Sequence, residues 1–89
     1  MRIENFEWDE TNRRHLTRHR VDPEESEEVF VGRVYLRRTH SGRYLAYGKT
    51  LDGRYLLVVF ELRGTTARVV TARDMTPKEK RLYRRRAKQ

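Results

Sequence analysis

The most apolar stretch of the chain covers residues 55–60, Tyr-Leu-Leu-Val-Val-Phe, and it continues past Glu61 to Leu62. Apolar side chains at consecutive positions fall on both faces of a strand, so this stretch predicts the central strand of a sheet, over 54–62. Strand-like alternation or β-branched residues predict further strands at 2–8, 33–38, 43–47 and 68–73. Glycine-containing turn sequences separate the last four strands, at 40–42, 51–53 and 64–66.

Three segments carry the signals of a helix start. Asp9 is placed to cap a first helix. In 22–25 and again in 76–79, a capping residue precedes a proline at the first helical position and a glutamate at the third. The predicted helices cover about 10–19, 23–30 and the residues from 77 onward.

The order of these elements is β-α-α-β-β-β-β-α. It predicts one α+β domain over residues 1–89, with an antiparallel meander, two N-terminal helices packed on one face and a C-terminal helix. No repeat or linker interrupts this order, and 89 residues suffice for one small domain with a modest core.

The formal net charge of +8 is unevenly distributed along the chain. Residues 1–30 contain five arginines and nine acidic residues, a net charge of −4, whereas residues 31–89 have a net charge of +12. Arginine supplies 17 of the 21 basic residues, which suits bidentate phosphate contacts. A solvated arginine-rich surface is the alternative interpretation.

The basic residues are concentrated in the last strand and the last helix. Arg68 and Arg73 flank the β-branched core of the strand, and we expect them to present guanidinium groups at one end of the sheet. The helix that follows carries Lys78, Lys80, Arg81, Arg84, Arg85, Arg86 and Lys88. This arrangement predicts that the end of the last strand and the last helix together bind phosphates.

Several function classes are excluded by composition. The chain has no cysteine, which excludes a disulfide scaffold and thiolate chemistry. It contains no apolar run of the roughly 18 residues that a membrane span needs, and its start lacks the core of a signal peptide. We therefore expect a cytoplasmic protein without membrane contact.

The first predicted helix carries polar groups on the face that should pack on the sheet. Asn12, His15, Leu16 and His19 share this face, spaced i, i+3, i+4 and i+7. The histidines could be hydrogen-bonded residues of the core or its rim, or they could line a pocket as proton donors or acceptors. His-x-x-x-His also suggests zinc, but the residue after His15 is Leu16 rather than the catalytic glutamate, and we expect no metal.

Four further residues have two interpretations each. Glu61 is either a half-exposed residue beside a turn or a carboxylate that orients Arg68 or Arg73. Lys49 is either a solvated lysine or a contributor to catalysis. Tyr83 is either a packing tyrosine or a contributor to catalysis. Trp8 belongs either to the core or to a platform on which bases stack. RNA cleavage without a metal needs proton-transfer groups and cations near the phosphate, and the chain offers both.

The order of motifs resembles one protein family. The motifs are Phe-Glu-Trp-Asp at 6–9, then Asn12, His15, Arg18-His19 and Pro-Glu-Glu at 23–25, and finally Arg-Val-Val-Thr-Ala-Arg-Asp-Met-Thr at 68–76 before a basic helix with Tyr83. Together they are similar to those of BrnT-type toxins over nearly the whole chain. One departure is His19-Arg20, where the family has His-Gly, so the first helix lacks its glycine cap.

The resemblance implies a RelE-like fold and the toxin of a type II toxin–antitoxin module, a metal-independent endoribonuclease that stops translation. It implies RNA as substrate and a cognate antitoxin with a ribbon-helix-helix DNA-binding part, so operator DNA is contacted only through the antitoxin. No cofactor is expected. A non-catalytic basic module that binds RNA or the antitoxin is the alternative function.

The resemblance and the residue chemistry together give the candidate site. The catalytic candidates are Arg68 and Arg73 as phosphate ligands, with His15, His19, Glu61 and Tyr83. The RNA-binding candidates are Lys49, Lys80, Arg81, Arg84 and Arg85. Trp8, Asp9 and Asn12 are motif residues without an assigned role.

Overall fold

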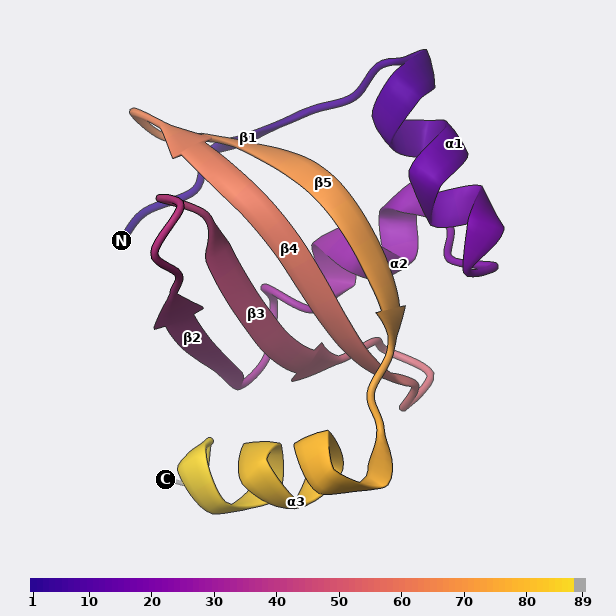
Figure 1. Ribbon diagram of the computed structural model, residues 1–89, viewed down its shortest axis with the longest axis vertical. Coiled ribbons are helices and arrows are strands. Elements are labelled where there is room, and N and C mark those ends of the chain that lie inside the picture. Colours follow the sequence, from indigo (N-terminus) through magenta and orange to yellow (C-terminus); the bar gives the residue numbers. More distant parts are fainter. Residues whose placement is uncertain (88–89) are drawn as a thin grey trace.

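Five strands form one mixed sheet in the order β1-β5-β4-β3-β2 in the computed structural model, which describes residues 1–87 (Figure 1). The elements are β1 (Asn5–Glu7), α1 (Glu10–Arg18), α2 (Pro23–Glu28), β2 (Val34–Arg38), β3 (Tyr44–Lys49), β4 (Tyr55–Arg63), β5 (Thr66–Asp74) and α3 (Pro77–Arg86). The predicted α+β class and element order are confirmed. Lys88, assigned above to the basic helix, lies outside the described residues.

β4 is the central strand of the sheet, as its apolar sequence predicts. Strands β2 to β5 form an antiparallel meander, and β1 pairs in parallel with the start of β5. β1 is shorter than the predicted strand over 2–8. A bulge interrupts the β4–β5 ladder, because Val59 lies opposite Thr71 whereas Phe60 lies opposite Val69, which leaves Val70 as the extra residue.

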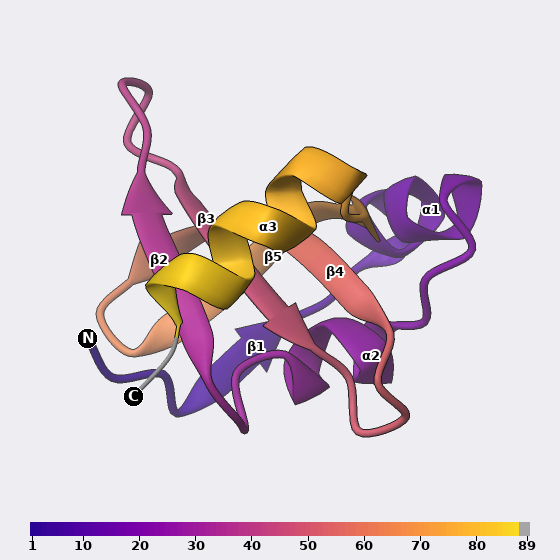
Figure 2. The same cartoon turned by 90° about the horizontal axis from the view of Figure 1, so that it is seen from below.

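The two faces of the sheet are covered by different helices. Leu56, Val58 and Phe60 of β4 are fully buried in the cluster that also contains Leu16 and Val29, under α1 and α2. Leu57 points to the other face, where it packs with residues of β3 and α3 in a second, smaller cluster. α3 therefore lies across the face opposite α1 and α2 (Figure 2).

Two of the predicted helix starts form complete capping boxes. The backbone N–H of Asn12 donates to the Asp9 carboxylate (3.0 Å), and the backbone N–H of Asp9 donates to the Asn12 side-chain oxygen (2.8 Å). At α3, the corresponding bonds join Thr76 and Glu79 at 3.2 and 2.9 Å. α2 begins at Pro23 as predicted, with the Asp22 amide bound to the Glu25 carboxylate at 3.0 Å.

α2 ends at Glu28, two residues earlier than predicted. Val29 then turns into the core and is fully buried against β3. A Cβ atom at Gly48 of β3 would lie 2.8 Å from a methyl carbon of Val29, so only glycine allows this close approach.

α1 ends in a Schellman motif. The Val21 amide bonds to the Leu16 carbonyl (3.1 Å) and the Arg20 amide to the Thr17 carbonyl (3.0 Å), while Val21 and Leu16 are both buried in the core. Arg20 has φ of 57°, in the left-handed region that this motif requires. An arginine therefore stands in the position for which glycine is favoured.

Candidate functional site

Arg68 and Arg73 lie on the same face of β5 as the side chains under α3. Arg68 is opposite Glu61, and Arg73 is opposite Leu57, four residues away along β4. At a rise of roughly 3.3 Å per residue, the two backbone positions are about 13 Å apart. The structure therefore does not bring the two arginines together at one end of the sheet.

Arg68 is engaged by two carboxylates of the β1–α1 segment. Its Nη1 donates to Asp9 Oδ2 at 2.7 Å and to Glu7 Oε2 at 3.4 Å. The hydrogen bond from Arg68 lowers the pKa of Asp9 below its ordinary value. Asp9 thus caps α1 and also holds Arg68, a second role that its position in the sequence did not indicate.

Arg73 forms a bidentate ion pair with Glu79, the third residue of α3 and the acidic member of its capping box. Both N–H···O distances are 2.8 Å, and Nη1 also donates to the Asp74 carbonyl at 3.0 Å. The hydrogen bond from Arg73 lowers the pKa of Glu79. This contact attaches the first turn of α3 to the end of β5.

Asn12 is a buried structural residue. Its side-chain amide donates to the Glu7 carbonyl and to the Val69 carbonyl, both at 2.9 Å, while its Oδ1 accepts the Asp9 amide. Only 1% of the residue is exposed. Asn12 therefore connects β1, α1 and the edge of β5 beyond the point where β1 ends, and all of its polar atoms are used.

The two histidines of α1 do not share a site. His15 Nδ1 lies 3.1 Å from the carbonyl oxygen of Val70, the bulge residue, and because a carbonyl only accepts, Nδ1 donates this hydrogen bond. His19 is exposed at the C-cap, and its backbone carbonyl accepts a hydrogen bond from Arg54. The structure therefore favours a hydrogen-bonded position at the rim of the core for His15, whereas His19 is exposed and contributes its backbone carbonyl.

Glu61 and Trp8 also have local partners. The Glu61 carboxylate accepts from Arg43 Nε at 3.1 Å. It lies opposite Arg68, and its charge helps to raise the pKa of that guanidinium, but no hydrogen bond joins the two side chains within residues 1–87. Trp8 packs against the core, and its indole N–H donates to Glu27 at 2.7 Å. This contact supports the core interpretation of Trp8.

Tyr83 fastens α3 to the sheet. It is 6% exposed, and its hydroxyl donates to the Arg33 carbonyl at 2.9 Å. Burial raises the pKa of Tyr83 above its ordinary value. Its ring meets the ring of Tyr55 edge-on, with 5.9 Å between centroids. The contacts of Tyr83 match the packing interpretation.

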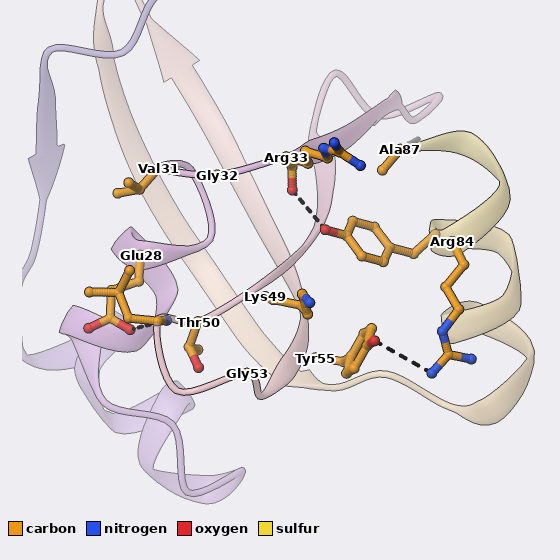
Figure 3. Close-up of a pocket in the computed structure, with 12 residues that line it drawn as sticks. Glu28, Val31, Gly32, Arg33, Lys49, Thr50, Gly53, Tyr55, Arg84 and Ala87 are labelled. Carbon is orange, nitrogen blue, oxygen red and sulfur yellow. Dashed lines mark hydrogen bonds between the residues drawn. The ribbon is translucent and has the colours of Figure 1, made fainter. Parts of the chain in front are cut away.

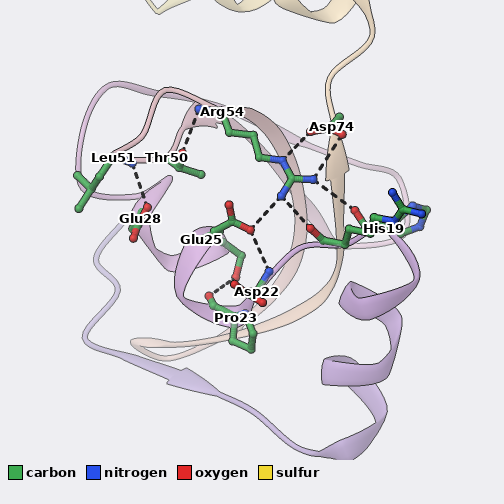
Figure 4. Close-up of polar contacts among 11 residues, drawn as sticks. His19, Asp22, Pro23, Glu25, Glu28, Thr50, Leu51, Arg54 and Asp74 are labelled. Carbon is green, nitrogen blue, oxygen red and sulfur yellow. Dashed lines mark hydrogen bonds and ion pairs between the residues drawn. The ribbon is translucent and has the colours of Figure 1, made fainter.

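Sequence reasoning did not single out Arg54, which links four segments of the chain (Figure 4). Its guanidinium donates to Asp74 (2.8 and 3.4 Å), to Glu25 (2.9 Å) and to the carbonyls of His19 (3.3 Å) and Arg20 (2.8 Å). The hydrogen bonds from Arg54 to Asp74 lower the pKa of that carboxyl. The five bonds saturate the donors of Arg54, which makes it a structural clamp rather than a ligand-binding group.

The RNA-binding candidates Lys49, Lys80 and Arg84 do converge, around the ring of Tyr55. The two lysine Nζ atoms and the Arg84 Cζ lie 5.5, 5.4 and 5.2 Å from the ring centroid. Within residues 1–87, none of the three cations forms an ion pair with a carboxylate. We call this group the Tyr55 cluster.

A pocket of about 560 Å³ lies beside the Tyr55 cluster, between α3, the β3–β4 turn and the loop that follows α2 (Figure 3). Lys49, Tyr55 and Arg84 line this pocket together with Arg33 and Tyr83, which are joined by the hydrogen bond from the Tyr83 hydroxyl. A second pocket of about 320 Å³, lined mainly by apolar residues, lies between β1, α2 and β2. Neither pocket contains Arg68, Arg73 or the histidines.

Arg81 and Arg85 lie apart from this cluster. Both are exposed, and the helical period places them on the side of α3 opposite the buried Tyr83. Of the five RNA-binding candidates, three therefore share one site and two lie on the outer surface of α3.

Within residues 1–87, no group of three or more histidine or acidic side chains is placed to hold a metal ion. No helix in this part of the chain is long and apolar enough to cross a membrane.

The fold and the site describe a small basic α+β protein in which three cations without a carboxylate partner among residues 1–87 converge on Tyr55 beside a pocket. A family model described as the ribonuclease toxin BrnT of type II toxin–antitoxin systems matches residues 8–79. The chain belongs to this family, which confirms the resemblance found in the sequence. A comparison with individual curated proteins finds no match. Family membership implies RNA as substrate and an antitoxin as partner.

Proposed function

We propose that this protein is a metal-independent endoribonuclease that acts in the cytoplasm and inhibits translation by cutting RNA. The family supports the ribonuclease activity. The observation that carries the proposal for this chain is the Tyr55 cluster, three unpaired cations beside a pocket of about 560 Å³. Cations without carboxylate partners are available for the phosphates of RNA.

The reaction requires a base for the 2′-hydroxyl proton, an acid for the leaving oxygen and cations around the phosphate. Arg73 is the β5 arginine nearest to α3, and its Nε is not used in its bonds to Glu79 and Asp74. A phosphate oxygen can join or replace Glu79 at this guanidinium. At Arg68, a phosphate oxygen would in the same way have to replace the Asp9 carboxylate.

The proposed partner is an antitoxin with a ribbon-helix-helix DNA-binding part. An acidic or amphipathic segment of it would cover the basic surface around α3, neutralising charge and blocking RNA together. Operator DNA would then be bound by the antitoxin and not by this chain. A cognate complex that leaves Arg68, Arg73 and α3 exposed would contradict this arrangement.

The nuclease activity is tested with purified protein, single-stranded RNA and excess EDTA. We expect discrete fragments in EDTA, and we expect Arg73→Ala to abolish them while Arg81→Ala, which removes an outer charge from α3, retains most of the cleavage. Fragments that require an added divalent ion would contradict metal independence. Expression in growing cells with pulse-labelling of new protein tests the inhibition of translation separately.

A second candidate function is a basic module that binds RNA or the antitoxin without turnover. The ion pairs of Arg68 and Arg73 favour it, because both proposed phosphate ligands are already held by carboxylates. Under this function RNA stays intact, while its affinity falls steeply with salt.

A further inference from the structure

We infer that Tyr55 gathers Lys49, Lys80 and Arg84 into a subsite that binds a phosphodiester of single-stranded RNA, with the adjoining nucleotide directed into the neighbouring pocket. The inference takes RNA as the ligand from the proposed function, but it concerns binding and not cleavage. Nothing in the sequence pattern points to Tyr55.

Three elements build the cluster. Lys49 ends β3 and lies directly opposite Tyr55 in the β3–β4 ladder. Lys80 and Arg84 are four residues apart on α3 and so lie on the same side of the helix. Figure 3 shows Lys49, Tyr55 and Arg84 directed toward one another at the pocket. The site therefore depends on α3 being fastened across the end of the sheet.

Within residues 1–87, no carboxylate lies within ion-pair distance of the three cations, although Glu28 lines the same pocket. Three cations within 5.5 Å of one ring centroid repel one another, and each contact with the ring face offsets this by only about 0.5–1 kcal/mol. By contrast, Arg43, Arg54, Arg68 and Arg73 are each paired with a carboxylate. A phosphate between the three cations would remove the repulsion that the protein leaves unbalanced.

Tyr55 acts here as a positioning residue. Because cations lie over its ring, the ring is not free for a base to stack on it. Its hydroxyl accepts a long hydrogen bond of 3.5 Å from Arg84. That bond, with the nearby lysines, lowers the pKa of Tyr55.

The pocket favours a nucleotide over an isolated anion. Apolar and backbone surface from Val31, Gly32, Tyr83 and Ala87 lies beside the cations. A nucleotide has the same two parts, a charged phosphate and a base with apolar faces. An acidic antitoxin peptide matches only the charges, so it is the alternative occupant that the experiment must exclude.

The test measures binding of a fluorescently labelled 2′-O-methyl single-stranded RNA, which lacks the nucleophile for cleavage, across a salt series. The cluster variant is Lys49→Gln/Lys80→Gln/Arg84→Gln. The matched control is Lys78→Gln/Arg81→Gln/Arg85→Gln, which removes the same charge from exposed positions of α3. For single strands the slope of log Kobs against log salt changes by about 0.7 for each phosphate that the protein neutralises, so losing the one phosphate held by the cluster should reduce the magnitude of the slope by about 0.7.

We expect affinity at low salt to fall more than tenfold in the cluster variant and less than threefold in the control. Tyr55→Phe should bind within about twofold of the unchanged protein, because the ring is retained, whereas Tyr55→Leu should bind several-fold more weakly. Thermal unfolding of each variant identifies any that fails to fold. If the triple variant of the cluster fails to fold, the RNA affinities of the single variants Lys49→Gln and Arg84→Gln decide whether the subsite exists.

Equal losses in the two triple variants would overturn the subsite, because they would show a diffuse charge effect. The subsite is also overturned if the cluster binds inorganic phosphate or a poly-glutamate peptide but does not bind the RNA. The proposed nuclease activity fails independently: a protein that binds the 2′-O-methyl RNA at the cluster but leaves ordinary RNA intact supports the subsite and contradicts cleavage.

Discussion

Arg73 and Glu79 are joined by two parallel hydrogen bonds of 2.8 Å between the end of β5 and the first turn of α3. The same carboxylate accepts the Thr76 amide at 2.9 Å, so one side chain caps the helix and fixes it to the sheet. Arg73 is also the proposed phosphate ligand of β5. Its replacement would therefore affect both the position of α3 and the binding of RNA.

We expect a double-mutant cycle of Arg73→Ala and Glu79→Ala to show a coupling free energy of about 1 kcal/mol. The bidentate geometry strengthens the pair, but the Arg73 side chain is 40% exposed, and solvent screening keeps the coupling modest. Urea unfolding of the four proteins measures the cycle, and additive effects would show that the ion pair is not stabilising. Loss of RNA cleavage in Arg73→Ala has to be compared with the folded fraction of that variant.

The protein should lose stability in acid. Arginine hydrogen bonds hold the pKa values of Asp9, Asp74 and Glu79 below their ordinary values of 3.8 for aspartate and 4.5 for glutamate. The unfolded chain thus binds protons more readily than the folded protein. The stabilisation is complete above the unfolded pKa values and is lost as pH falls through the lowered ones.

We therefore expect the urea midpoint to be constant above about pH 5 and to decline steadily at lower pH. Glu79→Gln keeps a capping side chain but removes one titrating group, so its decline should be shallower. A variant with the same slope as the unchanged protein would contradict a lowered pKa at Glu79.

Local sequence signals predicted the elements well. The apolar run at 55–60 identified the central strand, and the capping patterns at Asp9 and Thr76 located two helix starts. These features depend on residues within about four positions of one another, so their physics is visible in the sequence. The same signals placed the ends of β1 and α2 less exactly, because tertiary contacts decide where these elements stop.

The site could be predicted only in part. Lys49, Lys80 and Arg84 were identified as cations, but their convergence on Tyr55 depends on strand register and on the placement of α3. Asp9 and Glu79, which bind Arg68 and Arg73, were predicted as helix-capping residues, and neither ion pair was predicted. Side chains with several possible partners across the fold, such as Arg54, leave no local pattern to find.

Arg20→Gly should stabilise the protein by about 0.5–1 kcal/mol. The left-handed conformation costs a non-glycine residue about 1–2 kcal/mol, which the greater flexibility of glycine in the unfolded chain partly offsets. The Arg20 carbonyl, which accepts a bond from Arg54, is retained in the variant. Arg20→Ala is the matched control, since it removes the same side chain and keeps the strained φ of 57°. If both variants unfold at the same urea concentration, relief of backbone strain at Arg20 does not explain any change in stability.

Asn12→Ala should destabilise the fold by about 3 kcal/mol, because it leaves the Glu7 and Val69 carbonyls and the Asp9 amide without their partner in a buried site. Asn12→Asp is nearly identical in shape and keeps the acceptor for the Asp9 amide, but it replaces the donor to two carbonyls with a carboxylate oxygen. We expect it to be at least as unstable near neutral pH and to recover in part in acid, where the protonated carboxyl can donate one bond. Urea unfolding at two pH values measures both effects. A fully stable Asn12→Ala variant that has lost only RNA cleavage would instead assign Asn12 to the reaction and contradict its role as the connection between β1, α1 and β5.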